Sequence, residues 1–172
     1  AAGPSLQDIL PHLKEIKNKA IIVCVDTALR FCIKYNVEPD FIVLTDPQYW
    51  AYKHIDGIKS PSSILITESA VYPSVFRFLC KKIICCKSNF PLEHYFDSFR
   101  SEKGTLVAGG SVASTAWNFA QYAGASEIYV AGLDLAFVNK QTHIKGSTFE
   151  QATHTTSKRI ATAETSNMPI LF

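Results

Sequence analysis

Short, uninterrupted apolar runs alternate with segments of helical periodicity along most of this chain. The runs are rich in β-branched residues and occupy 20–25 (AIIVCV), 41–45 (FIVLT), 63–67 (SILIT), 82–86 (KIICC) and 127–131 (EIYVA). Continuous hydrophobicity is typical of strands that are buried on both faces, as in parallel sheets. We therefore predict an α/β fold with a Rossmann-like, mostly parallel sheet flanked by helices on both faces.

Four segments between these runs carry apolar residues three and four positions apart, which predicts crossover helices at 5–17, 27–35, 72–79 and 111–122. The chain opens on a glycine turn of the kind that follows a strand, so we expect the first strand of the sheet to be truncated. We assign 1–138 to a Rossmann-like nucleotide-binding domain. Residues 139–172 are polar with weak periodicity, which predicts a loop or lid and a C-terminal tail.

The amino-acid composition favours one globular domain and argues against a nucleic-acid-binding or membrane-spanning protein. The 172 residues are 47% hydrophobic, enough for one contiguous core. The formal net charge of +2 comes from scattered basic and acidic residues, which argues against a nucleic-acid partner. The five cysteines show no metal-site spacing, so we interpret them as reduced core thiols of a cytoplasmic protein. Since no apolar stretch approaches the ~20 residues that cross a bilayer, we expect no membrane span.

Two glycine turns are candidate phosphate-binding elements. Gly3, Pro4 and Ser5 stand at the head of a predicted helix, where free N–H groups and the positive helix end favour an anion. Gly109, Gly110 and Ser111 end an apolar run and open the strongest predicted helix. An ordinary helix start or a tight strand-to-helix turn would explain either motif without a ligand. The chain has neither a Walker A motif nor a complete G-x-G-x-x-G, so an ordinary ATPase or NAD enzyme is not supported.

Three aspartates follow predicted strands and are expected at one edge of the sheet, where open α/β folds bind ligands. They are Asp26, Asp46 and Asp134. Carboxylates there could accept ribose hydroxyls or base amines, or hold magnesium beside phosphates; helix capping is the alternative for Asp26 and Asp46. Downstream, His143 and Lys145 could supply acid-base and phosphate-neutralising groups, although a loop histidine can also be merely solvated.

The ordered motifs AGPSL, CVDTALRFCIKYNVEPDFIVLTDP, GGSVASTAWNFAQYAGASEIYVAGLDLAF and THIKG resemble the motility accessory factor (Maf) flagellin glycosyltransferases. That family shares a domain with archaeal 6-hydroxymethylpterin diphosphokinase, and its core is similar to bacterial sialyltransferases that use CMP-activated sialic acid. The resemblance covers roughly residues 1–147. It implies a sialyltransferase-like, Rossmann-like nucleotide-binding architecture.

The resemblance also implies roles for individual residues. Gly3, Pro4 and Ser5 match the first nucleotide-binding turn, and Gly110 with Ser111 matches the second, facing phosphate and sugar. Asp26 and Asp46 fall among the polar residues around the nucleotide. The pairs Gly132 with Asp134 and His143 with Gly146 match a G-x-D and an H-x-x-G element. Two positions depart from the family pattern, Leu133 for a frequent glutamine and Ala2 for glycine or asparagine.

The favoured function is transfer of a nonulosonic sugar, of the sialic, pseudaminic or legionaminic type, from a CMP donor to a protein hydroxyl, with flagellin as the expected acceptor. In this reading His143 is the base, Lys145 and the amides near Ser111 stabilise phosphate, and no cofactor is required. An alternative is diphosphate transfer from ATP to a pterin alcohol, with magnesium organised by Asp46 and Asp134. A third is a non-catalytic nucleotide-binding module within a longer chain.

Overall fold

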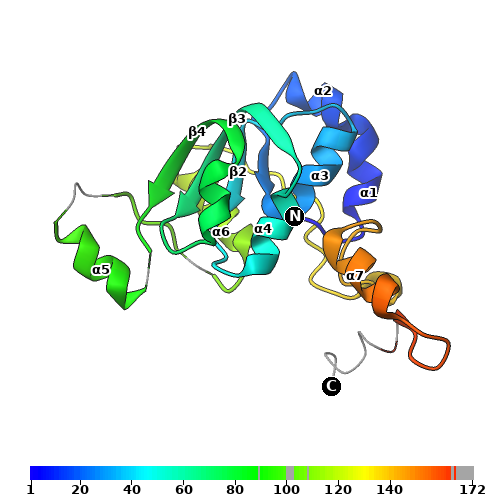
Figure 1. Cartoon of the computed structure of the whole chain (residues 1–172). Coiled ribbons are helices and arrows are strands. Elements are labelled where there is room, and N and C mark those ends of the chain that lie inside the picture. Colours follow the sequence, from blue (N-terminus) through cyan, green and yellow to red (C-terminus); the bar gives the residue numbers. More distant parts are fainter. Residues whose placement is uncertain (89, 100–102, 108, 164, 166–172) are drawn as a thin grey trace.

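A four-stranded parallel sheet forms the centre of the molecule in the computed structural model, which describes residues 1–88, 90–99, 103–107, 109–163 and 165. The strands lie side by side in chain order, and each is hydrogen-bonded to the next (Figure 1). They are β1 (Val23–Val25), β2 (Phe41–Leu44), β3 (Lys59–Glu68) and β4 (Leu79–Cys86). The predicted α/β fold with a parallel sheet is confirmed.

The central strands are buried as their apolar runs predict. Ile42, Val43 and Leu44 of β2 are 0% exposed, so both faces of this strand are covered. By contrast, β4 is an edge strand whose Leu79 and Ile84 remain exposed. Although it is less buried, β4 stays paired with β3 through backbone hydrogen bonds, with Ile84 opposite Ile66.

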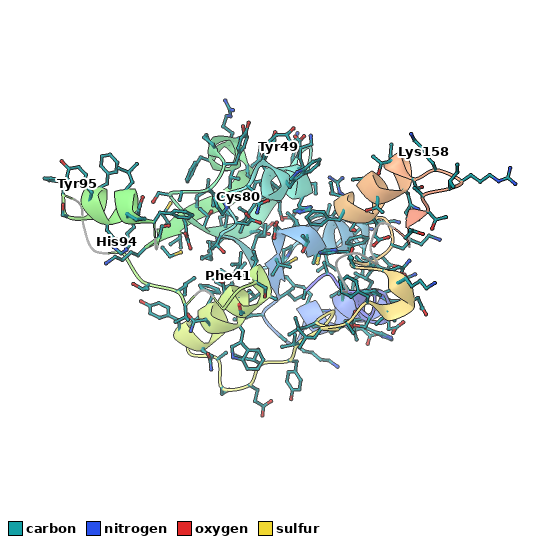
Figure 2. The ribbon with its side chains drawn as sticks, turned by 90° about the horizontal axis from the view of Figure 1, so that it is seen from below. Phe41, Tyr49, Cys80, His94, Tyr95 and Lys158 are labelled. Carbon is teal, nitrogen blue, oxygen red and sulfur yellow. The ribbon has the colours of Figure 1, made fainter. Side chains whose placement is uncertain are left out.

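Helices cover both faces of the sheet. Helices α3 (Asp26–Lys34) and α4 (Tyr49–Ile55) pack against each other on one face, and α6 (Val112–Tyr122) lies on the other (Figure 2). Helix α6 contacts β1 and β2, and the Phe119 ring meets the Phe41 ring edge-on with centroids 5.0 Å apart. The sheet is thus a middle layer, which explains its uninterrupted apolar strands.

Two predicted helices are shorter or more irregular in the structure. Segment 5–17 is divided into α1 (Leu6–Ile9), a 3-10 turn η1 (Leu10–His12) and α2 (Leu13–Lys17). Pro11 lies inside this segment, where a proline removes one helical hydrogen bond and clashes with the preceding turn. Segment 72–79 forms only the 3-10 turn η2 (Pro73–Arg77), and β4 begins two residues later. The apolar spacing is real, but it does not produce an α-helix there.

The predicted strand at 127–131 is wrong. This segment is not part of the sheet, and its Tyr129 and Val130 are 88% and 48% exposed, so no second layer covers it. Its end pairs instead with the start of the chain: the Ala1 nitrogen donates to the Ala131 carbonyl, and the Gly3 N–H donates to the Gly132 carbonyl, both at 2.7 Å. A short apolar run alone cannot distinguish a buried strand from an extended surface segment.

Two helices, α5 (Pro91–Asp97) and α7 (Thr148–Thr156), were not predicted from the sequence, whereas α4 corresponds to the helix-like segment expected after Asp46. The polar segment near the C-terminus starts with the 3-10 turn η3 (Val138–Lys140). Between this turn and α7, the Ile144 side chain is buried and only 1% exposed. Helix α5 stands away from the body beyond the carboxyl end of β4 (Figure 1). Among the described residues, no helix combines the length and the hydropathy required to cross a bilayer.

Candidate functional site

Two aspartates lie at the carboxyl edge of the sheet, as predicted. Asp26 is the first residue of α3 and follows β1 directly, while Asp46 comes two residues after the end of β2. Because β1 and β2 are parallel neighbours, both residues lie at the same edge. Asp26 is 3% exposed, and this burial, with a smaller contribution from the charge of Asp46, raises its pKa to about 7.

Two histidines complete this group. His54, from the last turn of α4, is 4% exposed, and burial lowers its pKa to about 4, with a smaller contribution from His143. The negative charge of Asp46 acts on His54 in the opposite direction. The Phe149 ring contacts both imidazoles, with centroids 4.7 Å from His54 and 4.8 Å from His143. We call Asp26, Asp46, His54 and His143 the rim cluster.

His143 is held by the loop that precedes α7. Its Nδ1 lies 3.1 Å from the Thr142 hydroxyl, and the buried Glu150 carboxylate accepts the Thr142 N–H at 3.2 Å. Burial lowers the pKa of His143, against a smaller opposing effect of Glu150. The imidazole is therefore neutral near pH 7 and able to accept a proton. Lys145 lies two residues further along the chain and is exposed to solvent.

A second group joins the start of the chain to the G-x-D element. The Ser5 N–H donates to Asp134 Oδ2 at 3.0 Å, and the Ser5 side chain also hydrogen-bonds this carboxylate. These bonds lower the pKa of Asp134. A Cβ at Gly3 would overlap the Asp134 carboxylate. Gly132 has φ +69°, and a Cβ there would lie 2.6 Å from the Ala1 carbonyl oxygen. We call Gly3, Ser5, Gly132 and Asp134 the clamp.

The clamp and the rim cluster are linked through the backbone. The Ile144 N–H donates to the Ala2 carbonyl at 2.8 Å, so the residue after His143 is tied to the residue before Gly3. Pro4 follows Gly3 and immediately precedes the N-cap of α1, Ser5. The first predicted turn therefore sits next to the predicted histidine, although the two are about 140 positions apart in sequence.

The second glycine turn caps α6. The Ser111 side chain accepts the Ser114 N–H at 3.4 Å, and Gly110 has φ +84°, which favours glycine. A Cβ at Gly109 would lie 2.6 Å from Ser114 Oγ. The turn follows Thr105, which forms a parallel bridge with Lys87 just past the end of β4. It therefore lies at the carboxyl edge of the sheet, and Gly109, Gly110 and Ser111 are all exposed there.

His54, Phe149 and Glu150 were not recognised from the sequence, because α7 was not predicted and no role was assigned to the helix-like segment that follows Asp46. A signal for α7 was present: Ser147 caps this helix by accepting the Glu150 N–H at 3.2 Å, and Ser-x-x-Glu is the pattern of a capping box. For α4 the signal was Asp46 itself, because its Oδ1 accepts the N–H of the N-cap residue Gln48 at 2.9 Å, in line with the capping alternative for this aspartate.

The five cysteines are free, and Cys24, Cys32 and Cys86 are buried as predicted for core thiols. Cys80 and Cys85 are half-buried. The sulfurs of Cys24 and Cys32 lie 3.7 Å apart beneath the start of α3. Across the described part of the chain, no three histidine, cysteine or acidic side chains are grouped so that they could hold a metal ion.

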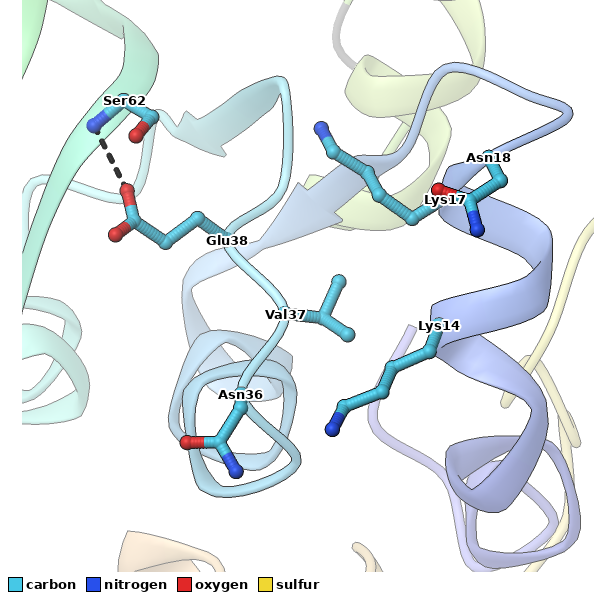
Figure 3. A pocket seen from close by; sticks show the side chains of 7 residues that line it. All are labelled: Lys14, Lys17, Asn18, Asn36, Val37, Glu38 and Ser62. Carbon is cyan, nitrogen blue, oxygen red and sulfur yellow. Dashed lines mark hydrogen bonds between the residues drawn. The ribbon is translucent and has the colours of Figure 1, made fainter.

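A cavity of about 490 Å³ lies at the opposite, amino-terminal edge of the sheet (Figure 3). Two of its charged groups have partners: Lys17 forms an ion pair with Asp40 at 2.5 Å, and Glu38 accepts the Ser62 N–H at 2.7 Å. Ligands of open α/β folds bind at the carboxyl edge. We therefore assign the candidate site to the rim cluster, the clamp and the Gly109–Gly110 turn rather than to this cavity.

Known proteins resemble this chain in both sequence and fold. Two uncharacterized proteins of Treponema pallidum (strain Nichols) are 40% identical to it over 145 residues and 30% identical over 115 residues. These matches cover 77% and 66% of this chain but 37% and 26% of the relatives. The chain thus spans roughly a third of the length of the relatives it matches.

A structural likeness and a family match agree with the sequence resemblance. The structure of the MAf glycosyltransferase from Magnetospirillum magneticum AMB-1 has a TM-score of 0.70 and 24% identity, over 78% of this chain and 22% of that protein. The sequence model of the family described as 6-hydroxymethylpterin diphosphokinase MptE-like matches residues 1–140. The chain therefore belongs to the MptE-like family and shares its fold with a Maf glycosyltransferase, as its motifs predict.

Proposed function

We propose that this chain is the nucleotide-binding part of a transferase that moves a nonulosonic sugar from a CMP donor to a protein hydroxyl, such as one on flagellin. The observation that carries the proposal is the position of the rim cluster and the Gly109–Gly110 turn at one edge of a parallel sheet. That edge is where nucleotides bind in open α/β folds. The fold shared with a Maf glycosyltransferase supports the same class of reaction.

In this proposal the exposed amides at Gly110 and Ser111 bind the donor phosphate, because the start of α6 offers free N–H groups and a positive dipole end. Asp46 is half-buried and accepts ribose hydroxyls or base amines. Asp26 is buried beneath it and positions the start of α3. In the clamp, Asp134 is already hydrogen-bonded to Ser5, so Gly3, Pro4 and Gly132 shape the wall of the site.

The proposed reaction is a displacement at the anomeric carbon. The acceptor oxygen forms a bond to that carbon, while the bond from the carbon to the phosphate oxygen breaks and its electron pair leaves with CMP. The acceptor proton passes to Nε2 of His143, because Nδ1 faces the Thr142 hydroxyl. Lys145 is exposed and would reach the phosphate only once the donor is bound.

Two measurements test this function. CMP should raise the melting temperature without magnesium, and Asp46→Ala should abolish that rise. His143→Ala should lower sugar transfer by the 10²–10⁴-fold typical of a general base, while CMP affinity changes by only a few-fold. His12→Ala is the matched control, because His12 is exposed in η1. An unchanged turnover in His143→Ala would remove this histidine from the mechanism.

The family description favours a second candidate, diphosphate transfer from ATP to a pterin alcohol. Magnesium would then be held between Asp46 and the phosphates, as hard oxygen ligands require. Asp134, the other carboxylate expected to contribute, is engaged by Ser5. Stabilisation by ATP that depends on magnesium, with no response to CMP, would favour this reaction.

A non-catalytic role is the third candidate, because the chain spans only about a third of its relatives. A nucleotide-binding module would be stabilised by CMP or ATP but would show no turnover of either donor in the full-length protein. The thermal shift and the transfer assay together separate the three candidates. The cytoplasmic location remains a prediction from the cysteine content.

A further inference from the structure

A second cavity, of about 530 Å³, lies beside the rim cluster. Pro47 lines it and follows Asp46 in the chain, and Ser69 lines it from the first position after β3. The outer wall is formed by Phe90, Leu92 and Phe96, from α5 and the residue before it. The cavity therefore opens at the carboxyl edge of the sheet, next to the proposed donor site.

The charged side chains at the polar wall of this cavity form an ion pair. The Glu93 carboxylate forms an ion pair with Lys103 and accepts the Ser69 hydroxyl, and the Lys103 ammonium lies 3.3 Å from Ser69 Oγ. The Glu93 and Lys103 side chains are only 9% and 16% exposed. Among the described residues that line the cavity, Glu93 is the charged one and Lys103 compensates its charge, so this lining does not favour a phosphate or a sugar acid. It suits an uncharged, apolar group.

An apolar strip continues outward from the cavity along α5 and includes Phe99, two residues after the helix ends. Leu92, Tyr95 and Phe99 are 67%, 61% and 72% exposed, and the helix projects from the body (Figures 1 and 2). Exposed aromatic clusters of this kind are typical of the anchoring centres of protein interfaces. A carbohydrate acceptor would instead need a surface rich in hydrogen-bonding groups. The strip therefore fits a polypeptide.

The size of the strip favours a short, transient segment over a stable partner. A helix of seven residues is about 10 Å long, whereas a stable protein interface uses roughly 20–30 residues a side. A cavity of this volume accommodates one large side chain with its neighbours. A substrate segment that binds, reacts and leaves needs no more than this.

We propose that the α5 cavity and strip bind the acceptor polypeptide, with an apolar side chain in the cavity and the reactive serine or threonine next to it in sequence. The anchor beside Pro47 would then bring the hydroxyl toward Asp46 and His143. That the bound hydroxyl accepts a sugar rests on the proposed function. Binding of the peptide does not depend on that function and can be measured separately.

The test uses two labelled heptapeptides with a central serine, one flanked by leucine and phenylalanine and the other by glutamines. Fluorescence anisotropy with the 172-residue chain should show at least 10-fold tighter binding of the apolar peptide. Leu92→Gln should weaken that binding at least 5-fold, and Phe90→Gln should act in the same direction. Ile160→Gln is the matched control, because Ile160 is 98% exposed and far from α5 in sequence. Leu92 is mostly exposed, so its substitution should leave the melting temperature unchanged.

Three outcomes would overturn the inference: equal affinity for both peptides, an equal loss in Ile160→Gln, or a dimer that Leu92→Gln converts to monomer. The last would identify the strip as an interface between two copies. The CMP thermal shift of the same variants keeps the two proposals apart. A preserved CMP shift without peptide binding contradicts only the acceptor site, whereas peptide binding without a CMP shift contradicts only the sugar-donor proposal.

Discussion

The backbone N–H of Ser5 donates to Asp134 Oδ2 at 3.0 Å, across 129 positions of sequence. This bond fastens the glycine turn at the start of the chain to the G-x-D element that follows α6. Both segments were expected to contact a nucleotide. In the structure they contact each other, and this close packing is sufficient to explain why positions 3 and 132 are glycines.

Replacing Asp134 with alanine should destabilise the protein. The substitution leaves the Ser5 N–H without its charged acceptor, and a lost hydrogen bond of this kind costs about 1–2 kcal/mol. Urea unfolding should show this loss, with Asp134→Asn intermediate because its carbonyl oxygen can still accept the N–H. Asp8→Ala is the control, since Asp8 is exposed on α1. A loss no larger than that of the control would mean that the Ser5 bond contributes nothing to stability.

Two glycines with similar backbone angles separate conformational strain from steric overlap. Gly132 (φ +69°) would place a Cβ 2.6 Å from the Ala1 oxygen, whereas Gly57 (φ +73°) has open space around its Cβ position. Gly57→Ala should therefore cost about 1 kcal/mol through its backbone conformation alone. Gly132→Ala should cost about 3 kcal/mol or more in the same denaturation experiment, because strain and overlap add. Equal losses would show that the start of the chain moves aside freely.

Asp26 and His54 should give opposite dependences of stability on pH. Asp26 has a folded pKa raised to about 7 from 3.8, so its contribution is greatest below pH 3.8 and is lost as the pH rises to 7. His54 has a folded pKa lowered to about 4 from 6.5, so its contribution is lost as the pH falls from 6.5 to 4. Each pKa unit corresponds to about 1.4 kcal/mol, so the His54 and Asp26 effects are of order 3 to 5 kcal/mol and largely oppose each other between pH 4 and 6.5.

Single variants should expose each pH effect. Compared with the unmodified chain, Asp26→Asn should lose more stability on acidification from pH 6.5 to 4, because the effect of His54 is no longer opposed by Asp26. Over pH 7 to 4, His54→Phe should shift the profile in the opposite direction, because the effect of Asp26 is no longer opposed by His54. Melting temperatures across this range provide the measurement. Parallel profiles for the two variants would contradict the assigned pKa shifts.

Removing Lys103 should be more harmful than removing Lys17. Lys103→Met removes the ion-pair partner of the largely buried Glu93 carboxylate, and removing one partner of a buried pair costs about 3 kcal/mol. Lys17→Met breaks a pair whose side chains are 33% and 35% exposed, and such surface pairs contribute about 0–1 kcal/mol. The double substitution of Lys103→Met with Glu93→Gln should recover most of the stability in urea unfolding. Failure of the double variant to recover would assign the loss to packing and not to the broken ion pair.

The amino-acid sequence alone determined the layered architecture. Strands β1 to β4 were recognisable by their apolar, β-branched runs, and the clearest instance is 41–45, which forms β2 and is buried on both faces. Helices α3 and α6 were recognisable by their periodicity. The position of Asp26 and Asp46 after adjacent parallel strands followed directly, since parallel strands end at one edge. The nucleotide roles of Gly3, Ser111 and His143 remain predictions.

Only the tertiary structure decided which side chains meet. His54 joins Asp46 and His143 because α4 and α7 pack beside the same edge, and neither helix has the long periodicity that reveals a helix in sequence. The apolar run at 127–131 satisfied the pattern of a strand, yet its end is held by Ala1 and Gly3 instead of by the sheet. The hydrophobic pattern of a helix or strand reflects which of its own residues are buried. Contacts such as Ser5 with Asp134 depend on segments far apart in the chain, and nothing local specifies them.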